Sequence, residues 1–356
     1  MGQRLPPRRR DVPRQPPADG RAVRRHPHRR ARCHGGWDAR RPPRVQGSGG
    51  RLSPAQPHEL RFDGRVAVVT GAGRGIGRAY AVLLAQRGAA VVVNDLGSSM
   101  EGAGADATPA ASVVDEISRL GGSAVVDGND VSTGAGAHAL IDRAVEQFGR
   151  IDVLINNAGI IRWAGFPEAD EENLARHLAV HTVGSFLTAR SAWPHMVEQG
   201  YGRIVMTTSS GVFGLPKNVS YATAKGGVIG LTRSLATAGA RHGIAVNLIA
   251  PAAATRMAGG FSDDAALAPA LVAPMAAYLA HEDCPVNGEM YAAGAGRFAR
   301  IFLASAPGYV HQGAEPTVED IAEHWGTIND EEGYVVPADL MTWSTSFLSH
   351  LTPDGE

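Results

Sequence analysis

A short apolar strand that runs through a glycine-rich turn into a helix constrains the fold of this chain more than any other feature. Val66–Thr70 is apolar and rich in valine, and the predicted helix covers 78–87. Glycines let the backbone approach a pyrophosphate closely, and the helix N-terminus offers amide donors with partial positive charge. This order is the context that a dinucleotide site requires. We therefore expect phosphate groups to bind at the turn, which contains Gly71, Arg74, Gly75, Ile76 and Gly77.

Strands and helices alternate along the chain that follows. Further strands are predicted at 90–94, 123–126, 151–155, 202–208, 244–249 and 288–291, and helices at about 107–120, 136–148, 171–199, 219–242 and 270–280. Right-handed crossovers between parallel strands place helices on both faces of a sheet. The sequence thus predicts an α/β fold with a doubly wound, parallel, seven-stranded Rossmann sheet in a single domain.

Acidic residues follow two of these strands. Asp95 lies eighteen residues after Gly77, where a carboxylate can accept from the hydroxyls of an adenosine ribose. It would repel the 2′-phosphate of NADP, so it favours NAD. Arg74 favours NADP instead, and we give Asp95 the greater weight because it would meet that phosphate directly. Asp130, after the third strand, is expected to contact the adenine.

Tyr221 and Lys225 lie four residues apart on a predicted helix and so share one face. A phenol titrates near pH 10, and a nearby ammonium is expected to lower its pKa. Such a tyrosine can exchange a proton with an alcohol or carbonyl oxygen. The chain has two lysines and thirty-two arginines, so a lysine at 225 indicates a need for a compact charged group. Alone, the pair is also typical of an ordinary surface helix.

The first sixty residues differ sharply from the rest. They contain fifteen arginines, ten of the twenty-two prolines and four acidic residues, without apolar periodicity. We expect residues 1–60 to be a disordered, dispensable tail. A nucleic-acid-binding arm, an organelle transit peptide and a metal site at His26, His28, Cys33 and His34 are weaker interpretations, because the supporting patterns are missing. We therefore expect no nucleic-acid partner and no metal.

The two cysteines, Cys33 and Cys284, lie far apart and favour a reducing compartment over a disulfide framework. No stretch reaches the apolar length of a membrane span. We expect a cytoplasmic protein without a membrane partner.

Several motifs together resemble the short-chain dehydrogenase/reductase family over about residues 61–296. They are the T-G-x-x-x-G-x-G turn, the Asn156–Gly159 turn, the Tyr221/Lys225 pair and a serine before that pair. The resemblance implies that Tyr221 is the acid/base and that Lys225 tunes it and binds the nicotinamide ribose. It further implies that Ser209 donates to the substrate oxygen, and that the cofactor contacts Asn157, Ala158, Gly159 and Thr255.

Two positions depart from the family pattern. His181 stands where the family has an asparagine whose main chain holds a water linked to the lysine; a main-chain carbonyl would preserve that link. The usual serine-to-tyrosine spacing of thirteen points to Thr208, whereas counting from the strand start favours Ser209, which leaves the donor open between the two. His177 and His181 also have the spacing of a zinc pair, but no third ligand is evident.

Within the family, the chain resembles the dehydrogenase part of peroxisomal multifunctional enzyme type 2 and its stand-alone bacterial relatives. The residues that show this are 61–66, 91–97, 180–186 and 294–296, together with an extension at 297–356 expected to pack on or near the domain. This implies NAD-dependent oxidation of 3-hydroxyacyl-CoA in fatty acid metabolism. The alternatives are a 3-oxoacyl thioester reductase, a steroid or alicyclic alcohol dehydrogenase, and a catalytically silent NAD-binding scaffold. Apolar residues such as Phe186, Val228 and Leu231 predict a homodimer or homotetramer.

Overall fold

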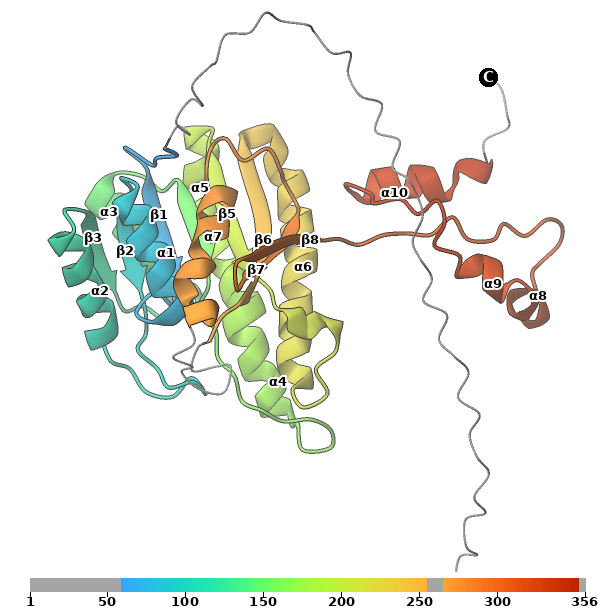
Figure 1. Cartoon of the computed structure of the whole chain (residues 1–356), viewed down its shortest axis with the longest axis horizontal. Helices are drawn as coiled ribbons and strands as arrows, with labels where there is room; N and C mark the ends of the chain where they lie inside the picture. Colours follow the sequence, from blue (N-terminus) through green and yellow to red (C-terminus); the bar gives the residue numbers. More distant parts are fainter. Residues whose placement is uncertain (1–58, 255–264, 352–356) are drawn as a thin grey trace, which may run out of the picture. The chain divides into compact units, whose positions relative to one another are not determined.

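A computed structural model describes residues 59–254 and 265–351. Within them one sheet has the strand order β3-β2-β1-β4-β5-β6-β7-β8 (Figure 1). The strands are β1 (Val66–Thr70), β2 (Ala90–Asn94), β3 (Ser123–Asp127), β4 (Val153–Asn156), β5 (Gly202–Thr207), β6 (Ile244–Ala252), β7 (Met290–Gly294) and β8 (Arg297–Ile301). All neighbouring pairs are parallel except β7 and β8. The predicted doubly wound α/β fold is confirmed.

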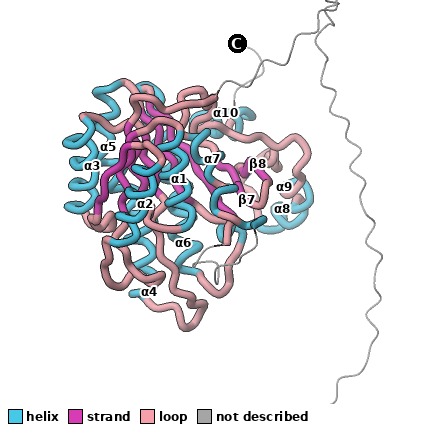
Figure 2. The backbone as a smooth tube through the Cα atoms, turned by 60° about the vertical axis from the view of Figure 1, so that its left-hand side comes forward, coloured by secondary structure: helices cyan, strands magenta, loops and turns pink. Residues whose placement is uncertain are grey.

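Helices cover both faces of this sheet (Figures 1 and 2). They are α1 (Gly75–Gln86), α2 (Thr108–Arg119), α3 (Gly134–Phe148), α5 (Gly184–Gln199), α6 (Val219–Gly239) and α7 (Ala273–Leu279). Side chains alternate along a strand, so Ala67 and Val69 pack with α1, α2 and α7, whereas Val66 and Val68 pack with α3, α5 and α6. The chain reverses its direction of winding between β1 and β4, which is where such sheets bind ligands.

The eighth strand corrects the prediction of a seven-stranded sheet. β8 pairs antiparallel with β7, and Glu289 makes a two-point ion pair with Arg300 across them. Ala295 and Gly296 form the two-residue turn, with φ of 51° and 73°. Paired positive φ values define the turn that suits a twisted hairpin. The sequence did not predict this hairpin, because alanine rarely adopts a positive φ.

The long helix predicted at 171–199 contains an unpredicted π-helical turn. α4 (Glu171–His177) leads into the π turn η1 (Leu178–Val183), and α5 continues from Gly184. A π turn holds more residues than an α turn, so it changes which side chains share a face. His181 lies in this turn, beside α6, the helix that carries Tyr221.

The C-terminal extension forms α8 (Val318–Glu323), α9 (Trp325–Ile328) and α10 (Leu340–Phe347). Ser305 pairs with Val335, and Arg233 on α6 donates to the carbonyls of Pro337 and Ala338 at 2.6 and 2.9 Å. None of residues 302–351 is fully buried. The boundaries 61–296 and 297–356 stay a prediction, and the predicted tail lies almost wholly outside the described residues. No helix in the described part is long and apolar enough to cross a membrane.

Candidate active site

The glycine turn is fastened to the end of β4. Asn157 donates from Nδ2 to the main-chain oxygens of Thr70 and Gly71, at 3.0 and 3.1 Å. The Thr70 hydroxyl accepts from the main-chain N–H groups of Asn157 and Ala158, both at 3.0 Å. A side chain at Gly71, where φ is +63°, would place its first carbon 2.8 Å from the Ala158 Cα. The two predicted motifs are therefore one rigid unit, and Thr70, which we did not predict, joins them.

Asp95 lies at the end of β2 and faces this unit. Its carboxylate accepts from the main-chain N–H groups of Gly73 and Gly97, each at 2.7 Å. Arg74 is half-exposed nearby, with its guanidinium 3.9 Å from Asp106. The Asp130 carboxylate, across the cleft, accepts from the Ser132 main chain and hydroxyl at 2.9 and 2.8 Å.

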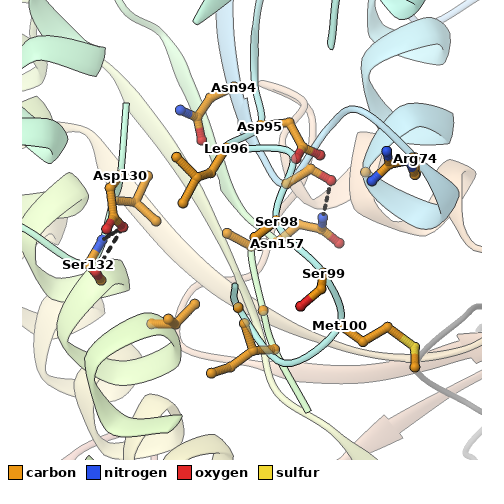
Figure 3. Close-up of a pocket in the computed structure, with 18 of the residues that line it drawn as sticks. Arg74, Asn94, Asp95, Leu96, Ser98, Ser99, Met100, Asp130, Ser132 and Asn157 are labelled. Atoms are coloured by element: carbon orange, nitrogen blue, oxygen red, sulfur yellow. Dashed lines mark hydrogen bonds between the residues drawn. The ribbon is translucent and has the colours of Figure 1, made fainter. Parts of the chain in front are cut away.

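These residues line a single cleft at the switch point of the sheet. Figure 3 shows Arg74 and Asp95 on one side and Asp130 with Ser132 on the other. Every predicted cofactor residue between Gly71 and Gly159 lines it, whereas Tyr221 and Lys225 do not. Thr255 lies outside the described residues. The first turn of α1 opens into the cleft and carboxylates stand where ribose and adenine are expected, so the donor set fits a dinucleotide.

Tyr221 stands in the first turn of α6 and is held there by an asparagine cap. The Asn218 side chain accepts from the Tyr221 main-chain N–H at 3.1 Å. Asn218 is fully buried and bridges to Ala164 in the loop after β4. An asparagine directly before a helix is a recognisable capping signal, so this residue was within reach of sequence reasoning.

The two candidate hydroxyl donors have different partners. Thr208 is buried and donates from Oγ1 to the main-chain carbonyl of Lys225 at 2.9 Å. Ser209 is close enough to Tyr221 for its hydroxyl to lower the Tyr221 pKa, and its Oγ accepts from the Gly211 main-chain N–H at 3.0 Å. The geometry brings Ser209 and Tyr221 together and leaves Thr208 facing the helix backbone.

Lys225 does not lower the pKa of Tyr221 as we expected. Burial raises the Tyr221 pKa, and the Ser209 hydroxyl opposes that rise. Lys225 is itself only 4 % exposed, and burial lowers its pKa to about 7. Its Nζ donates to the Thr207 main-chain oxygen at 2.8 Å and lies 5.8 Å from the Tyr221 ring centre. Helical spacing predicted the proximity but not the burial, which weakens the lysine as a cation.

His181 is buried in the π turn next to Tyr221. Its main-chain oxygen accepts from the Ser185 hydroxyl at 2.6 Å. Its ring and that of His177 contact main-chain groups of residues 160 and 162. The described residues contain no cluster of three metal-ligating side chains.

The chain belongs to the short chain dehydrogenase family, whose profile matches residues 65–265. It is therefore an oxidoreductase that acts on CH–OH groups, as predicted. Among curated proteins it is 44% identical over 279 residues to peroxisomal multifunctional enzyme type 2 of Drosophila melanogaster, covering 76% of this chain and 46% of that one. It is 43% identical to a putative short-chain type dehydrogenase/reductase of Mycobacterium tuberculosis, covering 76% of this chain and 95% of that one. The resemblance read from the motifs is confirmed.

Solved structures give the same grouping. A short chain dehydrogenase from Mycobacterium avium has a TM-score of 0.67 and 37% identity, over 76% of this chain and 97% of that one. A 7α-hydroxysteroid dehydrogenase in complex with NADH and 7-oxo glycochenodeoxycholic acid has a TM-score of 0.60 and 30% identity, over 67% of this chain and 95% of that one. The chain spans less than half the length of the animal multifunctional enzymes it matches.

Proposed function

We propose that this chain oxidises a 3-hydroxyacyl-CoA type substrate to the 3-ketoacyl form. The observation that carries the proposal is the 44% identity with a peroxisomal multifunctional enzyme type 2 over 279 residues, which cover 76% of this chain. The cofactor is NAD(H), which family membership and the NADH-bound neighbour support. A cytoplasmic location and a homodimer or homotetramer stay predictions.

The proposed roles follow from the contacts around Tyr221. Bound NAD+ supplies the hydride acceptor. Tyr221 takes the proton from the substrate hydroxyl, and Ser209 donates a hydrogen bond to the same oxygen. Lys225 is proposed to hold the nicotinamide ribose and to stabilise the phenolate once the ribose hydroxyls replace part of its lost solvation. His181 is proposed to act through its main chain.

Exposed aromatic side chains lie in the two loops that meet at Asn218, the cap of the helix that carries Tyr221, and they support a large apolar substrate. Trp163 and Phe166 are 53% and 79% exposed in the loop after β4, and Phe213 is 74% exposed in the loop after β5. The bridge between Ala164 and Asn218 holds the two loops together. Such a rim suits an acyl chain, and it would also suit a steroid, the alternative that the hydroxysteroid dehydrogenase neighbour favours.

A turnover panel tests the proposal. The purified chain with NAD+ is offered (3R)- and (3S)-3-hydroxydecanoyl-CoA, a hydroxysteroid and simple secondary alcohols, and NADH formation is followed by absorbance. We expect the (3R)-acyl-CoA to give the highest kcat/KM. Tyr221→Phe should lower its kcat by about a hundredfold or more, since the only proton carrier is lost. A higher kcat/KM for the steroid would favour the alternative, and NADH binding without any turnover would favour the silent scaffold.

A further inference from the structure

Two buried histidines hold a short segment that we name the strap, Ile160–Arg162. His177 Nδ1 lies 2.7 Å from the main-chain oxygen of Asn173 and donates to it, so Nε2 is free to accept from the Arg162 N–H at 3.3 Å. Asn173 donates from Nδ2 to the Arg162 oxygen at 3.1 Å. Both main-chain polar groups of Arg162 are therefore bound by α4.

His181 makes the equivalent contact two residues earlier in the strap. Its Nε2 lies 2.9 Å from the Ile160 oxygen and 3.3 Å from the Ile160 nitrogen. One nitrogen can serve one of these at a time, and the shorter distance assigns a proton on Nε2 that is donated to the oxygen. A side chain at Gly159 would bring its first carbon to 2.6 Å from His181 Cε1, so glycine is required for this approach.

The two contacts match in spacing. The two histidines bind main-chain groups of alternate residues of the strap, Ile160 and Arg162. The imidazole rings are stacked with their centres 6.0 Å apart and their planes 11° from parallel. On its opposite edge the strap donates from Ile161 N–H to the Met100 oxygen at 2.8 Å, and Met100 lines the cofactor cleft.

Both rings also pack against the Tyr221 ring, edge to face. The ring centres of His181 and Tyr221 are 5.2 Å apart, and those of His177 and Tyr221 are 6.2 Å apart. Burial lowers the pKa of both histidines, and the positive charge of Lys225 lowers them further. Arg162 and Arg176 act on His177 in the same direction, whereas the main-chain hydrogen bonds of both rings oppose it. The rings are therefore neutral packing groups at neutral pH.

We propose that His177 and His181 are positioning residues that hold the strap through their nitrogens and the Tyr221 ring through their faces and edges. The strap forms part of the cofactor cleft through Ile160 and reaches Met100, so the pair fixes the distance between that wall and the acid/base. This proposal rests on the proposed role of Tyr221. A displacement of about 1 Å at such a site can lower turnover by about a hundredfold.

Three single variants separate the hydrogen bonds that hold the strap from the packing against the Tyr221 ring. His177→Phe keeps a ring against Tyr221 but loses both hydrogen bonds of the imidazole. His177→Gln places an acceptor oxygen near the former Nε2 and loses the ring. His138→Gln changes an exposed histidine on α3 and serves as the control.

The first measurement is amide hydrogen exchange of the peptide that contains the strap, which needs no substrate. His177→Phe should exchange about tenfold faster there, whereas His177→Gln and the control should stay within about threefold of the parent. Unchanged strap exchange in His177→Phe would overturn the proposal. If that variant does not fold, Asn173→Ala removes the other strap contact and carries the same expectation.

The second measurement is kinetic, with NAD+ and (3R)-3-hydroxydecanoyl-CoA. His177→Phe should lower kcat by about tenfold to a hundredfold with the NADH dissociation constant changed by less than about threefold. His177→Gln should admit water beside Tyr221 and move the pKa seen in the pH–kcat profile downward. A purely structural role would lower the melting temperature of both variants without these shifts, and that result would overturn the proposal. Tyr221→Phe, assayed in parallel, tests the proposed function separately from the strap.

Discussion

The hydroxyl of Thr208 donates to the main-chain carbonyl of Lys225 at 2.9 Å, and so ties the end of β5 to the helix that bears Tyr221. Thr208→Val should remove this bond with little change of shape. We expect kcat to change by less than about threefold, while the lost bond of about 1 kcal/mol lowers the melting temperature by roughly 2–4 °C.

Ser209→Ala is the matched variant and should show the reverse pattern. Loss of the donor beside Tyr221 should lower kcat by about a hundredfold with little change in melting temperature. Steady-state kinetics and thermal unfolding of both variants check this pair. A larger loss of kcat in Thr208→Val would assign the donor to Thr208.

Lys225 should make stability depend on pH in a recognisable way. Its pKa is about 7 in the folded chain and near 10.5 when unfolded, so between these values the unfolded state binds more protons. The burial of Lys225 therefore lowers the free energy of unfolding by its full amount below pH 7, and this effect disappears as the pH rises toward 10.5. Lys225→Met should therefore gain stability relative to the parent mostly at or below pH 7.

Urea unfolding of both proteins at several pH values between 6 and 10, without cofactor, measures this difference. The hydrogen bond lost at Thr207 adds a pH-independent offset, so the informative quantity is how the stability difference changes with pH. A difference that does not vary with pH would show that Lys225 is charged in the folded chain throughout.

Lys225→Arg should leave kcat low, because a planar guanidinium does not replace a compact ammonium.

Asp95 should set the preference for NAD over NADP. We expect kcat/KM to favour NAD by at least about tenfold, or roughly 1.4 kcal/mol. Asp95→Ala should narrow this ratio, and it should also weaken NAD binding because the Gly73 N–H loses its acceptor. The exposed Asp115 on α2 provides an Asp→Ala control. A preference of the parent for NADP would show that Arg74 decides the choice.

The Arg- and Pro-rich segment should be dispensable. Its sequence has no apolar pattern with which to pack, and we predicted residues 1–60 to be dispensable. Because the Leu60 carbonyl accepts from Arg87, the deletion to test is residues 1–58, which should leave kcat and the melting temperature unchanged. A fall of several degrees would contradict this expectation.

Assembly should depend on Phe186. Val228, which we also named among the apolar residues that predict an oligomer, is fully buried in the core, whereas Phe186 is 47% exposed on α5. Light scattering of the parent should give a dimer or tetramer. Phe186→Glu should shift it to smaller species, and Glu198→Gln on the same helix is the control. A monomeric parent at micromolar concentration would contradict the prediction.

The parts that the sequence predicted well are those where local pattern and burial agree. Val66–Thr70 and Ala90–Asn94 have the predicted bounds because both faces of these central strands are buried. The sequence did not predict β8, because the turn before it places Ala295 at a positive φ. The direction of the Tyr221 pKa shift was predicted wrongly, because spacing along a helix carries no information about the solvent that folding removes. Thr255 lies outside the described residues, and its role stays a prediction.

The π turn at Leu178–Val183 has a consequence for alignment and for engineering. Such a turn accommodates one residue more than an α-helix does, and each residue of an α-helix turns the chain by about 100°. Deleting a single residue here could restore a continuous α-helix while rotating everything before it, including His177, away from its present neighbours. A homologue one residue shorter at this point would then show the same aligned residues in a gapped alignment. Its side chains around the substrate would nevertheless be placed differently.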